Sequence, residues 1–332
     1  MTMVRVAAVQ ATPVFLDGKA TVDKAVELIE EAGREGAQLM VFPEAFVPGY
    51  PDWVWRTTPW GGPSAALYDR LLENSVTVPG PAIDAMGAAA QRAGAYVAMG
   101  VNERSEVGST IYNSILYFGP GGDLLGVHRK LMPTGGERLV WGQGDGAGLF
   151  TIATPFGRVG GLICWESYMP LARAALYAQG IDFYLAPTWD NSDVWVASMR
   201  HIAKEGRVFV LSTNSVLRGS DVPAAELGAE DLWGGDDDWM SRGNACIVGP
   251  DGGVLAGPLT EEEGILYADV DTAELNHSRV QFDVAGHYSR SDVLRLVVDD
   301  TPKPVVVFGD GSPVRDERAS PEGVEPEAGE IS

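Results

Sequence analysis

The chain has 332 residues, of which 45% are hydrophobic, and nine of them are tryptophans. This composition excludes a disordered chain and suits one large α/β domain or two smaller ones. The formal net charge is −22, from 24 basic and 46 acidic residues. A chain this acidic repels phosphate backbones, so we expect no nucleic-acid partner.

Cysteine content and hydropathy indicate the cellular compartment of the protein. The two cysteines, Cys164 and Cys246, do not make a disulfide framework, which fits a reducing compartment. The start of the chain, Met1-Thr-Met-Val-Arg-Val-Ala-Ala-Val-Gln10, is typical of a strand and carries no basic leader. No segment is long enough to span a bilayer. We therefore expect a cytoplasmic protein with no membrane partner.

Apolar strands and amphipathic helices are predicted along the first part of the chain. Between 21 and 34, Val22, Val26 and Ile29 recur near helical spacing, and Pro81 is a favoured opening residue for a later helix. In chain order, strands are predicted at 4–9, 39–42, 96–101, 111–118 and 124–128, and helices at 21–34, 65–74 and 82–93.

The second part of the chain continues this pattern. An apolar strand from Val159 to Ile163 is predicted to end at Cys164. Strands with little polar alternation indicate sheets that are covered on both faces. The further predicted strands are 183–186, 208–213, 245–248, 253–256 and 265–270, and the further helices are 171–179 and 194–205.

Two segments differ in composition from the rest. The segment 217–242 is acidic and rich in glycine, so we expect a solvated loop, with a cation site as the less favoured alternative. The tail 313–332 is rich in Pro, Glu and Gly and has few large apolar residues, so we expect it to be disordered.

Three residues with complementary chemistry each follow an apolar strand. Cys164 lies at a predicted strand-to-helix corner, where the helix dipole favours a thiolate. A buried structural cysteine is the alternative. Glu44 and Lys130 end two other apolar strands. An acid can take the thiol proton and an ammonium group can stabilise developing negative charge, so the three together favour nucleophilic catalysis.

Motifs around these residues resemble those of the nitrilase superfamily, in particular its true nitrilase branch. The resemblance covers Val4 to Leu296. Its motifs are Phe42-Pro-Glu44-Ala-Phe-Val-Pro-Gly-Tyr-Pro51, His128-Arg-Lys-Leu-Met-Pro-Thr134, Glu137-Arg-Leu-Val-Trp-Gly-Gln-Gly-Asp145, Cys164-Trp-Glu166 with Met169-Pro170, and Gly286-His-Tyr-Ser-Arg-Ser-Asp-Val293.

The resemblance implies a fold and a set of roles. The fold would be a four-layer α-β-β-α sandwich, with 1–300 forming one carbon-nitrogen hydrolase domain. Glu44, Lys130 and Cys164 would be the catalytic triad, and Glu137 would be a second, structural or water-positioning glutamate. Homo-oligomers are also implied, as dimers that extend into spirals or larger assemblies. Ser167 stands where relatives often have Asn or His, which bears on substrate preference.

The expected reaction is hydrolysis of an organic nitrile to a carboxylic acid and ammonia. An amidase or a cyanide hydratase of the same superfamily is the close alternative, and a non-catalytic assembly protein is a distant one. Aromatic and polar residues just beyond the catalytic motifs are candidates for the substrate pocket, with core packing as the alternative for the tryptophans. These candidates are Tyr50, Trp53, Thr134, Trp165 and Trp189.

Other chemistries fit the sequence less well. No two of the four histidines have the close helical spacing of a zinc motif, so we expect neither a metal nor a cofactor. His128 and His287 are expected to orient their neighbours by hydrogen bonds. A Cys-His protease would need a histidine partner for Cys164, which the match at Glu44 and Lys130 outweighs. A phosphatase loop needs an arginine where Pro170 stands.

Overall fold

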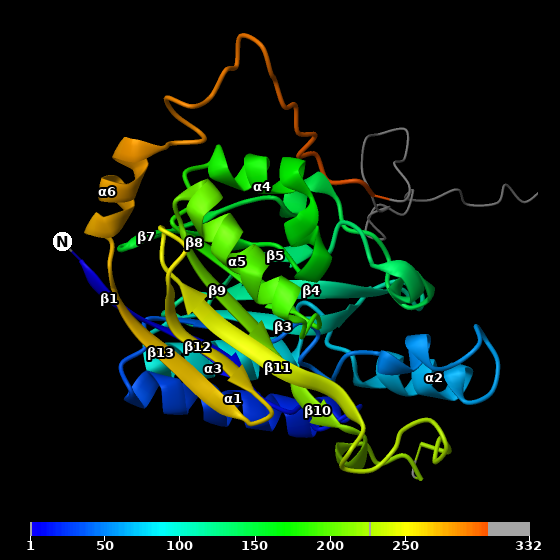
Figure 1. The fold of residues 1–332 in the computed structure, drawn as a ribbon. Helices are drawn as coiled ribbons and strands as arrows, with labels where there is room; N and C mark the ends of the chain where they lie inside the picture. The colour runs from blue at the N-terminus through cyan, green and yellow to red at the C-terminus, as the bar shows by residue number, and fades with distance from the viewer. Residues whose placement is uncertain (1, 226, 305–332) are drawn as a thin grey trace, which may run out of the picture.

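A computed structural model describes residues 2–225 and 227–304 of the chain. Within them, the strands form two sheets that lie face to face (Figure 1). The first sheet has the order β13 (Gly264–Asp271), β1 (Met3–Gln10), β2 (Leu39–Val41), β3 (Tyr96–Arg104), β4 (Ile111–Phe118) and β5 (Leu124–Arg129). The second has the order β10 (Val216–Arg218), β11 (Trp239–Val248), β9 (Phe209–Asn214), β8 (Phe183–Thr188), β7 (Gly157–Gly161) and β6 (Ile152–Thr154), with β12 (Val254–Thr260) paired to β11.

Helices cover the outer faces of both sheets (Figure 1). The helices α1 (Gly18–Arg34) and α3 (Pro81–Ala93) pack on the first sheet, and α4 (Pro170–Tyr177) and α5 (Asp193–Gly206) pack on the second. The remaining helices are α2 (Ser64–Asn74) at one edge and α6 (Ala273–Gln281) near the N-terminus of β1. Short 3-10 helices are η1 (Asp52–Trp55), η2 (Gly135–Leu139), η3 (Gly146–Gly148), η4 (Cys164–Tyr168) and η5 (Gly219–Asp221).

Alternation along the strands divides the core into layers. On β1, Ala7 and Val9 pack against the helices, whereas Val4, Val6 and Ala8 face the second sheet. Apolar residues from both sheets therefore share one central layer between them. The predicted α-β-β-α sandwich is confirmed, and none of the described helices has the length and hydropathy needed to cross a membrane.

Most predicted elements are present with ends shifted by a few residues, but several short ones were missed. Neither β6 nor β10, each of three residues, nor the helix α6 was predicted. The tail 313–332 lies outside the described residues, so its predicted disorder stays a prediction.

The acidic segment 217–242 is not simply a solvated loop, and that prediction is wrong. Trp233 is buried and donates a hydrogen bond from Nε1 to Asp52 Oδ2 over 3.0 Å. Asp238 accepts a hydrogen bond from Arg56 over 2.9 Å. The segment also begins with β10 and ends on β11. Its apolar side chains anchor it to η1, and net charge alone does not reveal such anchors.

Candidate active site

The three predicted catalytic residues meet because each one follows the end of a strand. Glu44 follows β2, Lys130 follows β5 and Cys164 follows β7. The strands β2 and β3 are parallel to β1, and β7, β8 and β9 are parallel to one another. The carboxyl ends of parallel strands lie at one edge of a sheet, which is where α/β proteins form their sites.

A glycine on β3 allows the segment that carries Glu44 to lie against the sheet. Phe42 donates its backbone N–H to Ala98, and Val47 donates to Gly100. A Cβ atom at Gly100 would collide with the carbonyl oxygen of Pro43. Only glycine therefore permits this approach of the two backbones.

Lys130 is a buried cation held between two carboxylates. Its Nζ lies 2.7 Å from Glu44 Oε1 and 2.7 Å from Glu137 Oε2, and its side chain is fully buried. The Trp141 ring centroid lies 5.5 Å from Nζ. Burial lowers the pKa of Lys130, but the charges of Glu44, Cys164 and Glu137 raise it above its ordinary value overall. The ammonium form is thus the stable one.

Glu44 has one oxygen fixed and one oxygen free. Its Oε1 accepts hydrogen bonds from Lys130 and from Asn113 Nδ2, each at 2.7 Å. Its buried Oε2 has no hydrogen-bond partner among the described residues. Burial raises the pKa of Glu44 to about 6, against the opposing effect of Lys130. A fixed carboxylate with a free oxygen and a raised pKa is suited to accept a proton.

Cys164 has a left-handed backbone conformation at the turn after β7, with φ of 53°. Its thiol is buried and accepts a hydrogen bond from Thr188 Oγ1 over 3.2 Å. Burial raises the pKa of the thiol, and the Glu44 charge adds to this effect. This direction is opposite to the one expected from a helix dipole, which would favour a thiolate. The resting group is a thiol, and it needs a base.

Glu137 is held from three directions. Its Oε2 accepts from Lys130 Nζ and, over 2.6 Å, from the backbone N–H of Thr134, while its Oε1 accepts from Tyr50 OH over 2.7 Å. Two of the predicted pocket residues, Tyr50 and Thr134, thus contact the charged cluster directly. With every oxygen engaged, Glu137 is less available as a base than Glu44.

Aromatic rings form a wall next to this cluster. Trp189 stacks on Tyr50 with a centroid distance of 4.4 Å and an interplanar angle of 5°, and Trp141 meets Tyr50 edge-on at 5.4 Å. Trp165 differs from these rings, because it is 50% exposed and donates its Nε1 hydrogen to Asp190 over 2.9 Å. The structure brings Trp189 to the cluster and turns Trp165 outward.

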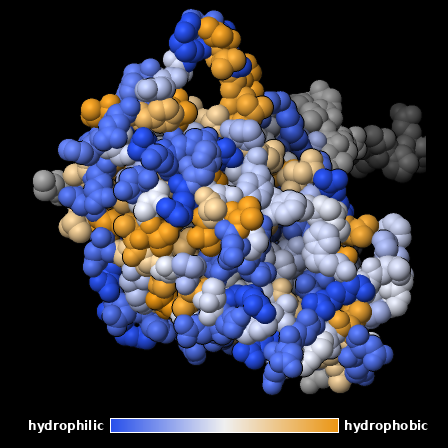
Figure 2. Space-filling model, viewed as in Figure 1, coloured by the Kyte–Doolittle hydropathy of each residue, from blue (hydrophilic) through white to orange (hydrophobic). Residues whose placement is uncertain are grey.

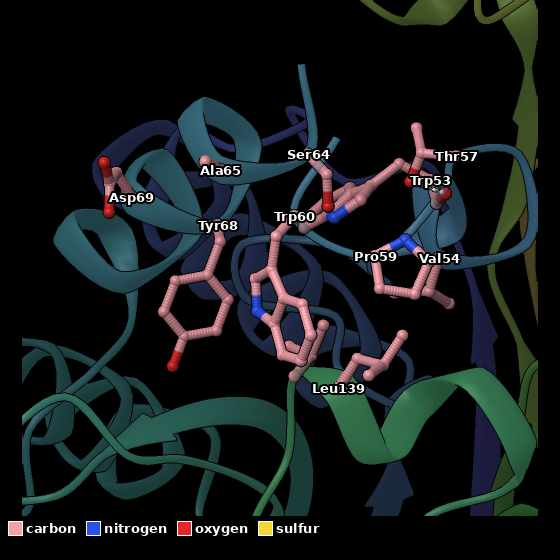
Figure 3. A pocket seen from close by; sticks show the side chains of 11 residues that line it. Trp53, Val54, Thr57, Pro59, Trp60, Ser64, Ala65, Tyr68, Asp69 and Leu139 are labelled. Carbon is pink, nitrogen blue, oxygen red and sulfur yellow. Dashed lines mark hydrogen bonds between the residues drawn. The ribbon is translucent and has the colours of Figure 1, made fainter. Parts of the chain in front are cut away.

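Trp53 is buried and borders a separate cavity of about 300 Å³. The cavity lies between the segment from η1 to α2 and the residues Leu139 and Val140. Figure 3 shows the Trp60 ring standing between Tyr68 and Leu139. The cavity lining does not include Glu44, Lys130 or Cys164.

Three residues of the site were not predicted from the sequence. Asn113 fixes Glu44, Thr188 contacts the nucleophile, and the Trp141 ring faces Lys130. Asn113 carried a signal, because it is a polar residue inside the apolar strand β4. Of the two histidines expected to orient their neighbours, His128 does so through two hydrogen bonds, whereas His287 is exposed and makes only a ring contact with Tyr288 among the described residues.

A buried carboxylate, a buried ammonium group and a buried thiol meet at this site, and these groups are suited to nucleophilic catalysis by a cysteine. The family model described as carbon-nitrogen hydrolase matches residues 5–279. The chain belongs to the carbon-nitrogen hydrolase family, and its predicted resemblance to the nitrilase branch is confirmed.

Named relatives extend over nearly the whole chain. An aliphatic nitrilase of Sinorhizobium fredii (strain HH103) is 48% identical over 92% of this chain and 99% of the relative. A bifunctional nitrilase/nitrile hydratase of Lupinus angustifolius is 44% identical over 93% of this chain and 90% of the relative. Among solved structures, a carbon-nitrogen hydrolase from Helicobacter pylori G27 shares the fold, with a TM-score of 0.70, 22% identity, and coverage of 87% of this chain and 96% of the other.

Proposed function

We propose that this protein hydrolyses organic nitriles to the carboxylic acid and ammonia, with Cys164 as the nucleophile. The observation that carries the proposal is the Lys130 ammonium group, held at 2.7 Å from both Glu44 and Glu137. It places a fixed positive charge in the cluster that contains the thiol. The relatives named as nitrilases at 43–48% identity support the choice of nitriles.

The first half of the reaction forms a covalent thioimidate. Glu44 Oε2 takes the thiol proton as the sulfur of Cys164 adds to the nitrile carbon, and the nitrogen gains negative charge. Lys130 and the backbone N–H of Trp165 stabilise that charge, as donors do in an oxyanion hole. The proton on Glu44 then passes to the nitrogen, which completes the thioimidate.

The second half releases the products. Water adds to the thioimidate carbon, and one of its protons passes to the nitrogen. The proton of the new hydroxyl group then passes through Glu44 to the nitrogen, and the C–N bond breaks to give ammonia and a thioester. A second water then cleaves the thioester to the acid and restores the thiol. Glu44 moves protons in each step, while Glu137 holds Lys130 in place. These steps use side chains, one backbone N–H group and water, and we propose that no metal or cofactor takes part.

A second product is favoured by one specific observation. Relatives at 44–45% identity are named bifunctional nitrilase/nitrile hydratase. If the tetrahedral species expels the Cys164 sulfur instead of ammonia, the product is the amide. A panel of aliphatic nitriles, aryl nitriles, amides and cyanide separates the candidates, with ammonia, amide and acid measured for each. Turnover of amides but not nitriles would overturn the proposal in favour of an amidase.

Apolar nitriles are the proposed substrate class. The Tyr50–Trp189 stack next to the cluster offers an aromatic surface to the organic group. Thr134 contributes through its backbone bond to Glu137, and Trp165 lies at the exposed side. Trp53 belongs to the same buried apolar cluster as Tyr50 and Trp141.

We also propose one catalytic domain over 1–300, a cytoplasmic location and homo-oligomeric assembly. The apolar layer shared by both sheets supports the single domain. Exposed apolar residues support assembly. Leu171 at the start of α4 is 66% exposed and Val194 at the start of α5 is 68% exposed. The segment after α6 arches over the molecule, and apolar side chains gather on it (Figure 2).

A further inference from the structure

A buried histidine and a buried glutamate remain outside the proposed reaction. His128 is on β5, two residues before Lys130, and Glu166 is in η4, two residues after Cys164. Each side chain is at most 1% exposed. Burying ionisable groups is costly unless they are paired, so their presence here needs a physical reason.

The Glu166 carboxylate binds the backbone next to both catalytic residues. Its Oε1 accepts the N–H of Leu131, which follows Lys130, over 2.6 Å. Its Oε2 accepts the N–H of Ile163, which precedes Cys164, over 2.7 Å. One side chain therefore joins the segment after β5, in the first sheet, to the segment after β7, in the second.

The hydrogen bonds of His128 indicate how many protons it carries. Its Nδ1 lies 2.9 Å from the carbonyl oxygen of Gly148, and its Nε2 lies 2.9 Å from Glu166 Oε2. A carbonyl oxygen only accepts, so Nδ1 carries a hydrogen. A carboxylate also only accepts, and Glu166 accepts two backbone N–H groups besides its contact with His128. Both ring nitrogens then donate, and the ring is an imidazolium.

We propose that His128 is an imidazolium in the resting enzyme, and that the His128–Glu166 ion pair is a positioning element that fixes Lys130 relative to Cys164. The proposal rests on the proposed function only for the roles of those two residues. Glu166 ties the two segments together, and His128 compensates its buried charge and anchors it to η3 through Gly148. Neither side chain takes part in the bond changes at the nitrile carbon.

The surroundings favour the charged pair. Burial lowers the pKa of His128, but the charge of Glu166, its hydrogen bond and the Gly148 carbonyl together raise the pKa above its ordinary value. Two tyrosines also lie near Glu166, Tyr117 on β4 and Tyr184 on β8, and the pKa of each is raised, first by burial and also by the charge of Glu166. Both tyrosines are therefore neutral and leave the charge of the pair unchanged.

The charge on His128 can be measured without substrate. Nitrogen NMR of protein labelled with ¹⁵N-histidine distinguishes an imidazolium, with two protonated nitrogens, from a neutral ring. The signal of His128 is identified among the four histidines as the one that single Gln substitutions at the exposed His201, His277 and His287 leave in place. We expect an imidazolium spectrum for His128 at pH 7.5, which is above the ordinary pKa of a histidine side chain. A neutral His128 ring would overturn the proposal, whatever the protein hydrolyses and even if the variants fail to fold.

The positioning role is tested by kinetics on folded variants. Glu166→Gln replaces one carboxylate oxygen with an amide NH2 group, which cannot accept a hydrogen bond from a backbone N–H. The change should therefore release one of the two segments and lower kcat by ~10- to 100-fold while KM changes little. The amide-to-acid ratio should also shift, because Lys130 moves relative to the nucleophile. The matched control is His201→Gln, which breaks an exposed His–Glu pair on α5 and should leave both readouts unchanged. A Glu166→Gln enzyme with native kcat and product ratio would show that the pair does not position the site.

Discussion

The two oxygens of Glu44 have different environments, and this difference defines its proposed role. Oε1 is occupied by Lys130 and Asn113, and Oε2 is left without a partner among the described residues. Glu44→Gln keeps the shape and removes the base, so kcat/KM for nitrile hydrolysis should fall by ~10² or more. This kcat/KM is measured from the rate of ammonia release. Glu31→Gln, an exposed change on α1, is the control, and a fully active Glu44→Gln enzyme would remove Glu44 from the catalytic set.

The raised pKa of Glu44 predicts the acid side of the pH profile. Burial raises this pKa to about 6, and the base acts only when it is ionised. The value of kcat/KM should therefore be high above pH 6 and fall as the pH drops through about 6, because Glu44 gains a proton. Kinetics on an uncharged nitrile between pH 5 and 8 measure this, with circular dichroism as the control for unfolding. A profile that stays flat down to pH 5 would contradict the assignment.

Site residues that lie in sequence motifs could be predicted, whereas those that reach the site through strand pairing could not. Glu44, Lys130 and Cys164 end apolar strands in recognisable motifs, so their chemistry is visible in the chain. Asn113 and Thr188 reach the site through the packing of strands. Asn113 lies opposite Lys130 across β4 and β5, and Thr188 lies at the end of β8, where it contacts Cys164. Spacing along the sequence does not show that register.

Two expectations that were based on neighbouring sequence, for Trp165 and for the Cys164 thiol, differ from the structure. Trp165 follows the nucleophile, yet the turn at Cys164 directs successive side chains to different sides, and Trp165 is exposed. A helix dipole was expected to favour the thiolate form of Cys164. The loss of water around it has the larger effect and raises its pKa.

At the scale of elements, the contact between β3 and the Glu44 segment is the most sensitive to change. A Cβ at position 100 would collide with the Pro43 carbonyl, so Gly100→Ala should displace Glu44, lower kcat by ~10²-fold and reduce the melting temperature. Gly235→Ala is the matched control, because a Cβ there meets no atom within 4 Å. Equal activity and stability of the two variants would show that the backbone approach is not what positions Glu44.

The alternation of strands and helices was predictable, and the short elements were not. Apolar periodicity marks the long strands and the helices that cover them. The helix α6 has a single buried residue, Leu275, so its sequence has no apolar stripe. The strand β10 has only three residues and is defined by its pairing with β11. Such elements depend on contacts with distant parts of the chain.

At the scale of the whole molecule, the exposed segment after α6 predicts assembly. Leu294 is 78% exposed and Val297 is 82% exposed, within a run of apolar residues. Large exposed apolar patches mark interaction sites. We expect light scattering to give a mass of at least twice 35.4 kDa, and Leu294→Asp with Val297→Asp to lower it. Lys19→Asp, an exposed change on α1, should leave it unchanged, and a native monomer would contradict this part of the account.

The covalent role of Cys164 is the central claim, and mass spectrometry of the trapped enzyme tests it most directly. The enzyme is mixed with a nitrile that it turns over, quenched in acid and digested. We predict that the peptide containing Cys164 carries the added mass of the acyl or thioimidate group. Cys164→Ala should lose both the adduct and ammonia release, while Cys246→Ala, in the buried strand β11, should keep both. Ammonia release by Cys164→Ala protein, or an adduct on another peptide, would contradict the account.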